Sequence, residues 1–379
     1  MEPYVFVARP FEGHDEFFER VSRVVRDSVK LACEDGKIGP SQELRAHVLG
    51  LIARSELIVA EISTRNPNVL YEVGFAAGIR KTPLLIAKKG SEIPADIQGL
   101  KRIEYTELDE NFDASLAAHL KWEIEINSRV GLLRDMLEGP VAQPAFVLTS
   151  PKYPAPGVPS SIQFFDTRTF GDNLGVLGLI SAFASMWGPG NGVELLSAQY
   201  SHPAIMGEDV NLYLIGSPKA NPLTQQALRE LHNGPEEWSF GGLGGEPMAG
   251  NYTSVLRRKV SDSLVEYHAL DPKKDFPPGA RTHEGYGLVV RGPHPRFRKH
   301  RILTLMAGGR SVGTGAACLA ATHPVLIQKI RDKLPRDTDL SDKTCTFWAL
   351  VKGSYSDPRR LLEPENVTVK EAGTLPRAV

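Results

Sequence analysis

The sequence predicts an α/β protein, with an amino-terminal flavodoxin-like or Rossmann-like domain on a parallel sheet and a second α/β domain after it. Three observations lead to this fold class. Short apolar runs alternate with helical segments up to about residue 130. These runs are apolar on both faces, as in a parallel sheet that helices cover on both sides. The order strand, turn, helix then returns in the second half of the chain.

The elements of the first half follow one another with short connections. Tyr4–Phe11 predicts a strand that ends in a turn, and helical periodicity follows over Glu16–Gly36. The next expected elements are a helix over Ser41–Ser55, a strand over Glu56–Ser63, a helix over Asn66–Gly78, strands over Thr82–Lys89 and Lys101–Glu107, and a helix over Phe112–Asn127. Asn66 followed by Pro67 is typical of an N-cap and a first helical position.

The length of 379 residues favours two domains. Six prolines lie between Gly139 and Pro159, around one short strand-like run. We therefore expect a first domain over residues 1–138, a Pro-rich linker over 139–160 and a second domain over 161–379.

The second half carries its own α/β signals. Its expected elements are a helix over Asp172–Trp187, strand–turn–helix units over Val210–Leu231 and Arg301–Pro324, strands over Gly285–Gly292 and Lys343–Gly353, and a glycine-rich loop over Phe240–Gly250.

Composition excludes several classes of protein. The net charge of −1 gives no global case for nucleic acid or an anionic membrane as a partner. The three cysteines form no CxxC pair, which suits a reducing cytoplasm, and the start of the chain lacks the pattern of a signal peptide. The longest apolar run, Leu174–Trp187, is too short to span a bilayer. The histidines show no metal-binding spacing, so we expect neither a metal nor a bound cofactor.

Candidate chemistry gathers at the predicted carboxyl ends of the parallel strands, where open sheets bind ligands. The first strand ends in Arg9, Pro10 and Phe11, and the strand ELIVAE ends in Glu61 shortly before Ser63. Glu72 lies about one turn into the next helix. Two carboxylates in one cleft can act on a sugar anomeric carbon, one attacking or stabilising the oxocarbenium-like state and the other handling a proton.

A simpler interpretation stays open for this segment. A glutamate near a helix start is favoured by the helix dipole alone, and Asn66 can be a helix cap and nothing more.

The segments SELIVAEIS and RNPNVLYEVGFAAGIRKTPLLIA, with VFVARPF before them and IPADIQGLKRIEY after them, resemble the TIR-like and nucleoside 2-deoxyribosyltransferase-like superfamily over residues 3–107. The resemblance implies cleavage of an N-glycosidic bond in nucleosides or in NAD, with Glu72 as nucleophile or oxocarbenium stabiliser. It also implies a homo-oligomer, since a neighbouring subunit often completes the site. This chain departs from the family at Glu61, where an Asp is usual, and at Ala77, where a His is frequent.

With this resemblance, Glu72 and Glu61 become the candidate catalytic residues. NAD, a nucleoside or a nucleotide is the expected substrate and is not a resident cofactor. The residues expected to line its pocket or hold its ribose and phosphate are Arg9, Pro10, Phe11, Ser63, Asn66, Asn68 and Tyr71.

In the second domain, two turns that follow strands could cradle a phosphate at a helix start. The residues concerned are Gly216, Ser217, Gly308, Gly309, Gly313 and Thr314. The second turn, GGRSVGTG, faintly resembles SLOG-type nucleotide-sensing domains, which implies a signal nucleotide as ligand. Close packing of strand on helix explains such glycines equally well.

A basic segment, Arg291–Arg301, lies between two predicted strands. It is either a solvated loop or an arm that contacts phosphates.

Three functions remain from the sequence. The first is an N-glycosidase controlled by a ligand-sensing domain, a layout that resembles bacterial anti-phage effectors which deplete NAD. The second is a nucleotide-binding protein without catalysis. The third is a housekeeping nucleoside deoxyribosyltransferase, for which the second domain would be surplus.

Overall fold

The computed structural model describes residues 3–37, 44–79, 81–100, 102–142, 144–149, 170–188, 193–197, 203–218, 221–232, 237–241, 255–269, 283–355 and 362–376. The chain divides into two compact units, Met1–Ser128 and Arg129–Val379. The division falls within helix α4 (Glu110–Leu137), upstream of the predicted linker. Within that linker, Ala145–Thr149 forms strand β6, and residues 150–160 lie outside the described part.

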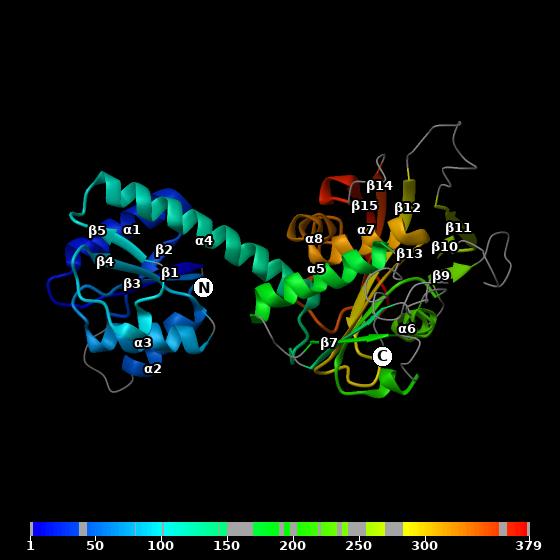
Figure 1. The fold of residues 1–379 in the computed structure, drawn as a ribbon, viewed down its shortest axis with the longest axis horizontal. Helices are drawn as coiled ribbons and strands as arrows, with labels where there is room; N and C mark the ends of the chain where they lie inside the picture. Colours follow the sequence, from blue (N-terminus) through cyan, green and yellow to red (C-terminus); the bar gives the residue numbers. More distant parts are fainter. Residues whose placement is uncertain are drawn as a thin grey trace, which may run out of the picture. The chain divides into compact units, whose positions relative to one another are not determined.

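The first unit is a five-stranded parallel sheet in the order β2-β1-β3-β4-β5, the order of flavodoxin-like folds (Figure 1). The strands are β1 (Tyr4–Ala8), β2 (Ala32–Glu34), β3 (Leu57–Glu61), β4 (Leu84–Lys88) and β5 (Arg102–Tyr105). Both β1 and β3 are buried along their whole length, which explains their continuous apolar sequence. The predicted α/β class is confirmed.

Helices cover both faces of this sheet (Figure 1). One face packs against α2 (Leu44–Arg54) and α3 (Pro67–Gly78), and the other packs against α1 (Asp15–Val29) and α4. Side chains of a strand alternate between faces. In β3, Leu57 and Val59 therefore belong to the α1 and α4 side, whereas Ile58 and Ala60 belong to the α2 and α3 side.

Two first-unit elements differ from the prediction. Helix α1 ends at Val29 because Lys30 adopts a left-handed conformation, with φ 61°, and the chain then forms the short strand β2. The helix predicted over Glu16–Gly36 is therefore too long. Helix α4 runs to Leu137, ten residues beyond the predicted end at Asn127, because its last turns bury Leu132, Leu133 and Met136.

The second unit contains a seven-stranded mixed sheet in the order β15-β14-β12-β13-β8-β6-β7. Neighbours from β7 to β13 run parallel, and the remaining pairs are antiparallel. The strands are β6, β7 (Val193–Ser197), β8 (Asn211–Ile215), β12 (His283–Pro293), β13 (Ile302–Gly308), β14 (Phe347–Tyr355) and β15 (Val367–Thr374).

One face of this sheet packs against three helices and the last turns of α4, and the other packs against a helix and a small sheet. The three helices are α5 (Phe170–Trp187), α7 (Arg310–Thr322) and α8 (Pro324–Arg331). The opposite face carries α6 (Leu223–His232) and an antiparallel sheet of β9 (Trp238–Gly241), β10 (Val255–Val260) and β11 (Ser263–Tyr267). Of the loop predicted over Phe240–Gly250, Phe240 and Gly241 belong to β9, and residues 242–250 lie outside the described part. No helix among the described residues has the length and apolar character needed to cross a membrane.

Candidate active site

Arg9, at the end of β1, holds neighbouring carboxylates in place at this edge of the sheet. Its guanidinium binds Asp35 just beyond β2, with Nη2 at 2.7 Å from Oδ2, and contacts Asp15 at 3.1 Å. The group also lies 5.0 Å from the ring centre of Phe18 and 5.9 Å from that of Phe11. The side chain is 2% exposed. Arg9 is therefore held by protein contacts and fixes the position of the Asp35 carboxylate.

Glu72 lies on α3, partly buried at the same edge of the sheet. Burial, and to a smaller extent the nearby charge of Asp35, raise the pKa of its carboxyl group to about 7. A carboxyl group with this pKa exists in both protonation states near neutral pH. Perturbed acids of this kind concentrate at functional sites, although structural clusters also contain them.

Glu61 ends β3 and is fully buried. Its Oε1 accepts hydrogen bonds from the backbone N–H and the hydroxyl of Ser63, whose Oγ in turn accepts a bond of 2.6 Å from the Lys88 N–H. Its Oε2 has no hydrogen-bond partner within the described residues and lies 3.8 Å from Nδ1 of His14. Burial and the Glu61 charge raise the pKa of Tyr105, at the end of β5. Polar groups of Ser63 after β3, of Tyr105 at the end of β5 and of His14 before α1 thus lie around one carboxylate.

The two candidate carboxylates belong to opposite faces of the sheet. Glu61 continues the alternation of Leu57 and Val59, which face α1 and α4. Glu72 belongs to α3, which packs on the other face. Within the described part of the chain, no hydrogen bond or ion pair joins Glu61 and Glu72. The structure instead places Glu72 with Asp35 and Glu61 with His14.

The remaining predicted substrate contacts differ in their exposure and in their hydrogen bonds. The Asn66 side chain caps α3 by accepting bonds from the N–H groups of Asn68 and Val69, at 2.9 and 3.3 Å. Asn68 itself is exposed, as are Tyr71 at 52% and Phe11 at 41%. Pro10 is buried, and its carbonyl accepts a bond from Arg9.

Sequence reasoning missed His14, Asp35 and Tyr105. The helix that the sequence predicts over Glu16–Gly36 includes Asp35, because β2 has only three residues and no apolar pattern that would indicate a strand. Tyr105 could have been found, because it stands at the carboxyl end of a predicted strand. A hollow of about 320 Å³ lies beside Tyr105 and is bordered by Glu107, Asp109 and Asn111.

In the second unit, the glycine-rich turn packs against β12. A Cβ on Gly313 would lie 2.1 Å from the Tyr286 carbonyl oxygen, and one on Gly308 would lie 2.3 Å from the backbone of Gly313. The Gly309 N–H donates to the same Tyr286 oxygen at 3.0 Å, and Thr314 is 4% exposed. Close approach of α7 to the sheet therefore accounts for these glycines, and a phosphate site here stays a prediction.

The other predicted turn follows β8. Gly216 has φ 106°, a conformation that favours glycine, and its N–H donates to the Met306 carbonyl at 3.0 Å. The Ser217 carbonyl accepts a bond of 2.8 Å from Asn221, which begins the connection to α6. These contacts shape the turn, and ligand binding at Gly216 and Ser217 also stays a prediction.

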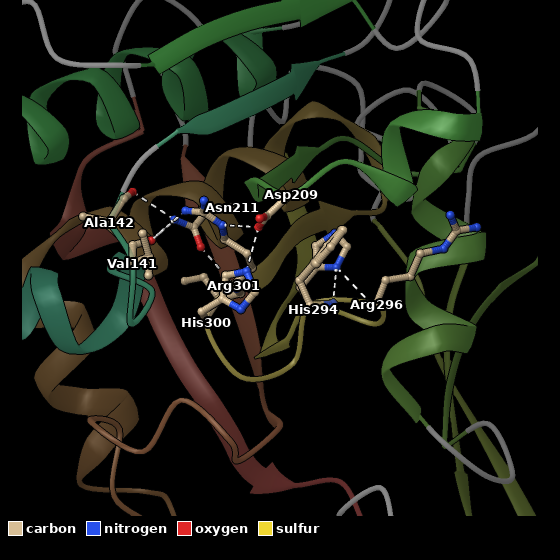
Figure 2. Close-up of polar contacts among 10 residues, drawn as sticks. Val141, Ala142, Asp209, Asn211, His294, Arg296, His300 and Arg301 are labelled. Atoms are coloured by element: carbon tan, nitrogen blue, oxygen red, sulfur yellow. Dashed lines mark hydrogen bonds and ion pairs between the residues drawn. The ribbon is translucent and has the colours of Figure 1, made fainter.

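The basic segment Arg291–Arg301 is partly tied into the fold, as Figure 2 shows. His300 Nε2 and Arg301 Nε contact the same oxygen of Asp209, at 2.8 and 2.7 Å. Next to them, Asn211 Nδ2 donates to the carbonyls of Val141 and Ala142 (Figure 2).

Two residues in the first half of the same segment also have partners within the fold. Arg291 is fully buried against Phe347 and donates to the carbonyls of Leu340 and Asp342. His294 is buried, and its Nδ1 accepts bonds from the N–H groups of Arg296 and Phe297. Only the central cations of the segment remain exposed.

Comparisons with known proteins do not assign a family. No protein-family model matches the chain, and no curated protein matches it in sequence. Among solved structures, the chain is similar to an ABC transporter, LacI family transcriptional regulator from Brachyspira murdochii, at 14% identity and a TM-score of 0.19. That alignment covers 57% of this chain and 66% of the other. A TM-score this low supports no conclusion about fold or function.

Proposed function

We propose that the first unit cleaves N-glycosidic bonds of NAD, nucleosides or nucleotides, with Glu72 acting at the anomeric carbon of the ribose. The observation that carries this proposal is the position of Glu72 at the ligand-binding edge of a parallel sheet, partly buried and beside Asp35. The resemblance of the surrounding segment to TIR-like and deoxyribosyltransferase-like domains supplies the reaction class.

In this proposal the ionised Glu72 carboxylate attacks C1′ or stabilises the positive charge that develops there as the base leaves. The electron pair of the breaking C–N bond stays with the departing base. Water, or a second base in a transfer reaction, then completes the substitution. Partial burial favours this step, because a weakly solvated carboxylate interacts strongly with a developing cation.

In this proposal, exposed side chains that follow β1 or lie on α3 contact the substrate. Phe11 and Tyr71 offer aromatic surfaces for a base, and Asn68 offers an amide for a ribose hydroxyl. Arg9 and Asn66 act indirectly, because their side chains are engaged in holding Asp35 and capping α3. We propose that the second unit regulates the first by binding a ligand. The expected homo-oligomer and cytoplasmic location belong to the same proposal.

A nucleotide-binding protein without turnover is the second candidate. The specific observation in its favour is that Glu61 and Glu72, the pair expected to catalyse together, belong to opposite faces of the sheet.

The two candidates differ in whether free base is released. Purified full-length protein is incubated with NAD and a panel of nucleosides and nucleotides, with and without candidate signal nucleotides, and free base is measured by chromatography. Base release supports the enzyme. Binding without release, across the whole panel and with every added nucleotide, supports the binding protein and contradicts the enzyme.

A further inference from the structure

Glu61, at the end of β3, has one carboxylate oxygen that no described residue satisfies. The side chain is fully buried, and its Oε1 accepts from the backbone N–H and the hydroxyl of Ser63. Its Oε2 is buried as well and has no hydrogen-bond partner within the described part of the chain. Because a buried carboxylate oxygen without a donor is unfavourable, we expect a donor close to Oε2.

His14 is the donor that the fold places beside this oxygen. Its Nδ1 lies 3.8 Å from Glu61 Oε2, and contacts within catalytic groups are often this long before substrate binds. Although His14 occupies the N-cap position of α1, its imidazole makes no capping bond to the helix. Arg9 cannot take its place, because the guanidinium is held by Asp35 and Asp15. The imidazole is therefore available to Glu61.

The surroundings of this pair are apolar on one side and accessible on the other. Burial and, to a smaller extent, the Glu61 charge raise the pKa of Tyr105, so its hydroxyl keeps its proton at neutral pH. The ring of Tyr105 packs against Phe112 and Phe17, with ring centres 5.3 and 6.5 Å away. The His14 side chain, in contrast, is 19% exposed, so water reaches the imidazole.

A carboxylate beside one ring nitrogen of a histidine selects the tautomer and so decides what the other nitrogen can do. When Glu61 accepts from Nδ1–H, Nε2 carries no proton and is able to accept one. His14 lies in the turn between β1 and α1, which also carries Phe11. That turn follows the carboxyl end of a parallel strand, where open sheets bind ligands.

We propose that Glu61 and His14 form a dyad, in which Glu61 orients the imidazole and His14 Nε2 takes a proton from the water that completes N-glycosidic cleavage. The inference rests on the proposed function of Glu72. In the two-step route, Glu72 bonds to C1′ as the base departs with the electron pair of the C–N bond. The water oxygen then bonds to C1′ while the Glu72 carboxylate leaves with its electron pair. One water proton moves to Nε2 and passes on to the departed base or to solvent.

The positions of the two glutamates agree with this order of events. Glu72 comes from the side of α2 and α3, whereas Glu61 continues the face that α1 and α4 cover. Water that displaces a bound carboxylate approaches C1′ from the opposite side. His14, which begins α1, belongs to that side.

The dyad is tested without turnover by the ¹⁵N chemical shifts of the histidine rings in the full-length protein at pH 8.5, above the usual titration range of histidine. We expect His14 to carry its proton on Nδ1, with its signals assigned by their loss in H14Q. In E61Q the amide oxygen faces the Ser63 N–H, so the amide NH₂ faces His14 and should move the proton to Nε2. His47, exposed on α2, is the internal control and should not change. A wild-type His14 without its proton on Nδ1 overturns the dyad, and that measurement needs no variant.

Release of free base then separates His14 from Glu72. H14Q should lower steady-state turnover about 10²-fold or more and keep the first stoichiometric release of base, because only the water step loses its base. E72Q should lose both phases, and H47Q should match wild type. Turnover of H14Q at the wild-type rate overturns the role of His14 and leaves that of Glu72 intact. If wild type itself releases no base, the proposed function fails, and the catalytic role of the dyad fails with it whatever its tautomer.

Discussion

The carboxylates of Asp35 and Glu72 lie close enough for the charge of Asp35 to add to burial in raising the pKa of Glu72 to about 7. Asp35 cannot move away freely, because Arg9 holds its Oδ2 at 2.7 Å. The ion pair at the ends of β1 and β2 thus adds to burial in shifting the ionisation of a residue on α3.

This relationship predicts a shift in the pH dependence of turnover. Since the proposed reaction uses the ionised form of Glu72, the rate should rise with pH through about 7. D35N removes a negative charge, lowers the pKa of Glu72 and should move this rise to lower pH. The pH–rate profile is measured together with an NMR titration of the Glu72 carboxyl carbon. D27N, an exposed change on α1, is the control, and a D35N profile identical to wild type would contradict the relationship.

The same pKa predicts how Glu72 affects stability. The folded-state pKa lies above the unfolded value of 4.5, so the folded state is favoured below pH 4.5 and loses this contribution as pH rises through about 7. E72Q has no charge to bury. It should therefore raise Tm relative to wild type at pH 8 and leave it nearly unchanged at pH 5, as measured by calorimetry. An equal change in Tm at both pH values would argue against a buried, ionising Glu72.

His294 predicts a sensitivity of the second unit to acid. Burial lowers its pKa to about 4, well below the usual 6.5, so between these values protons bind preferentially to the unfolded chain. The contribution of His294 to the free energy of unfolding should be fully present above pH 6.5 and should be lost as pH drops toward 4. H294N keeps an acceptor for the N–H groups of Arg296 and Phe297 but cannot be protonated. Denaturant unfolding should show a flatter pH dependence for H294N than for wild type, and parallel curves would exclude this role.

The packing of the glycine-rich turn predicts a strong effect of one methyl group. G313A would place a Cβ 2.1 Å from the Tyr286 carbonyl oxygen, and helix and strand would have to separate. We expect a loss of roughly 2–4 kcal/mol in the free energy of unfolding. G131A is the matched control, because a Cβ there meets nothing within 4 Å and alanine favours a helix. If G313A is as stable as wild type, packing does not explain this glycine.

Much of the fold could be predicted from the sequence because its signals are local. The Asn66–Pro67 pair marks the start of α3, and the continuous apolar runs at Tyr4–Ala8 and Leu57–Glu61 mark buried strands. Strand β2 could not be predicted, since its three residues are held by pairing with β1 and carry no apolar pattern of their own.

The candidate site could be predicted only in part. The rule for open sheets places both glutamates near the carboxyl ends of the strands, but it does not say on which face of the sheet each one lies. That depends on the alternation within β3 and on which helices cover which face, both of which are tertiary facts. His14 and Asp35 enter the site through such long-range packing.

The central claim is that Glu72 performs the chemistry, and single-turnover release of free base from NAD or a nucleoside tests it most directly. Wild-type protein, E72Q and the exposed-carboxylate control E16Q are compared at pH 8, with folding checked by circular dichroism. We expect release by wild type and E16Q at similar rates and a loss of about 10³-fold or more in folded E72Q. Undiminished base release by folded E72Q would contradict this claim.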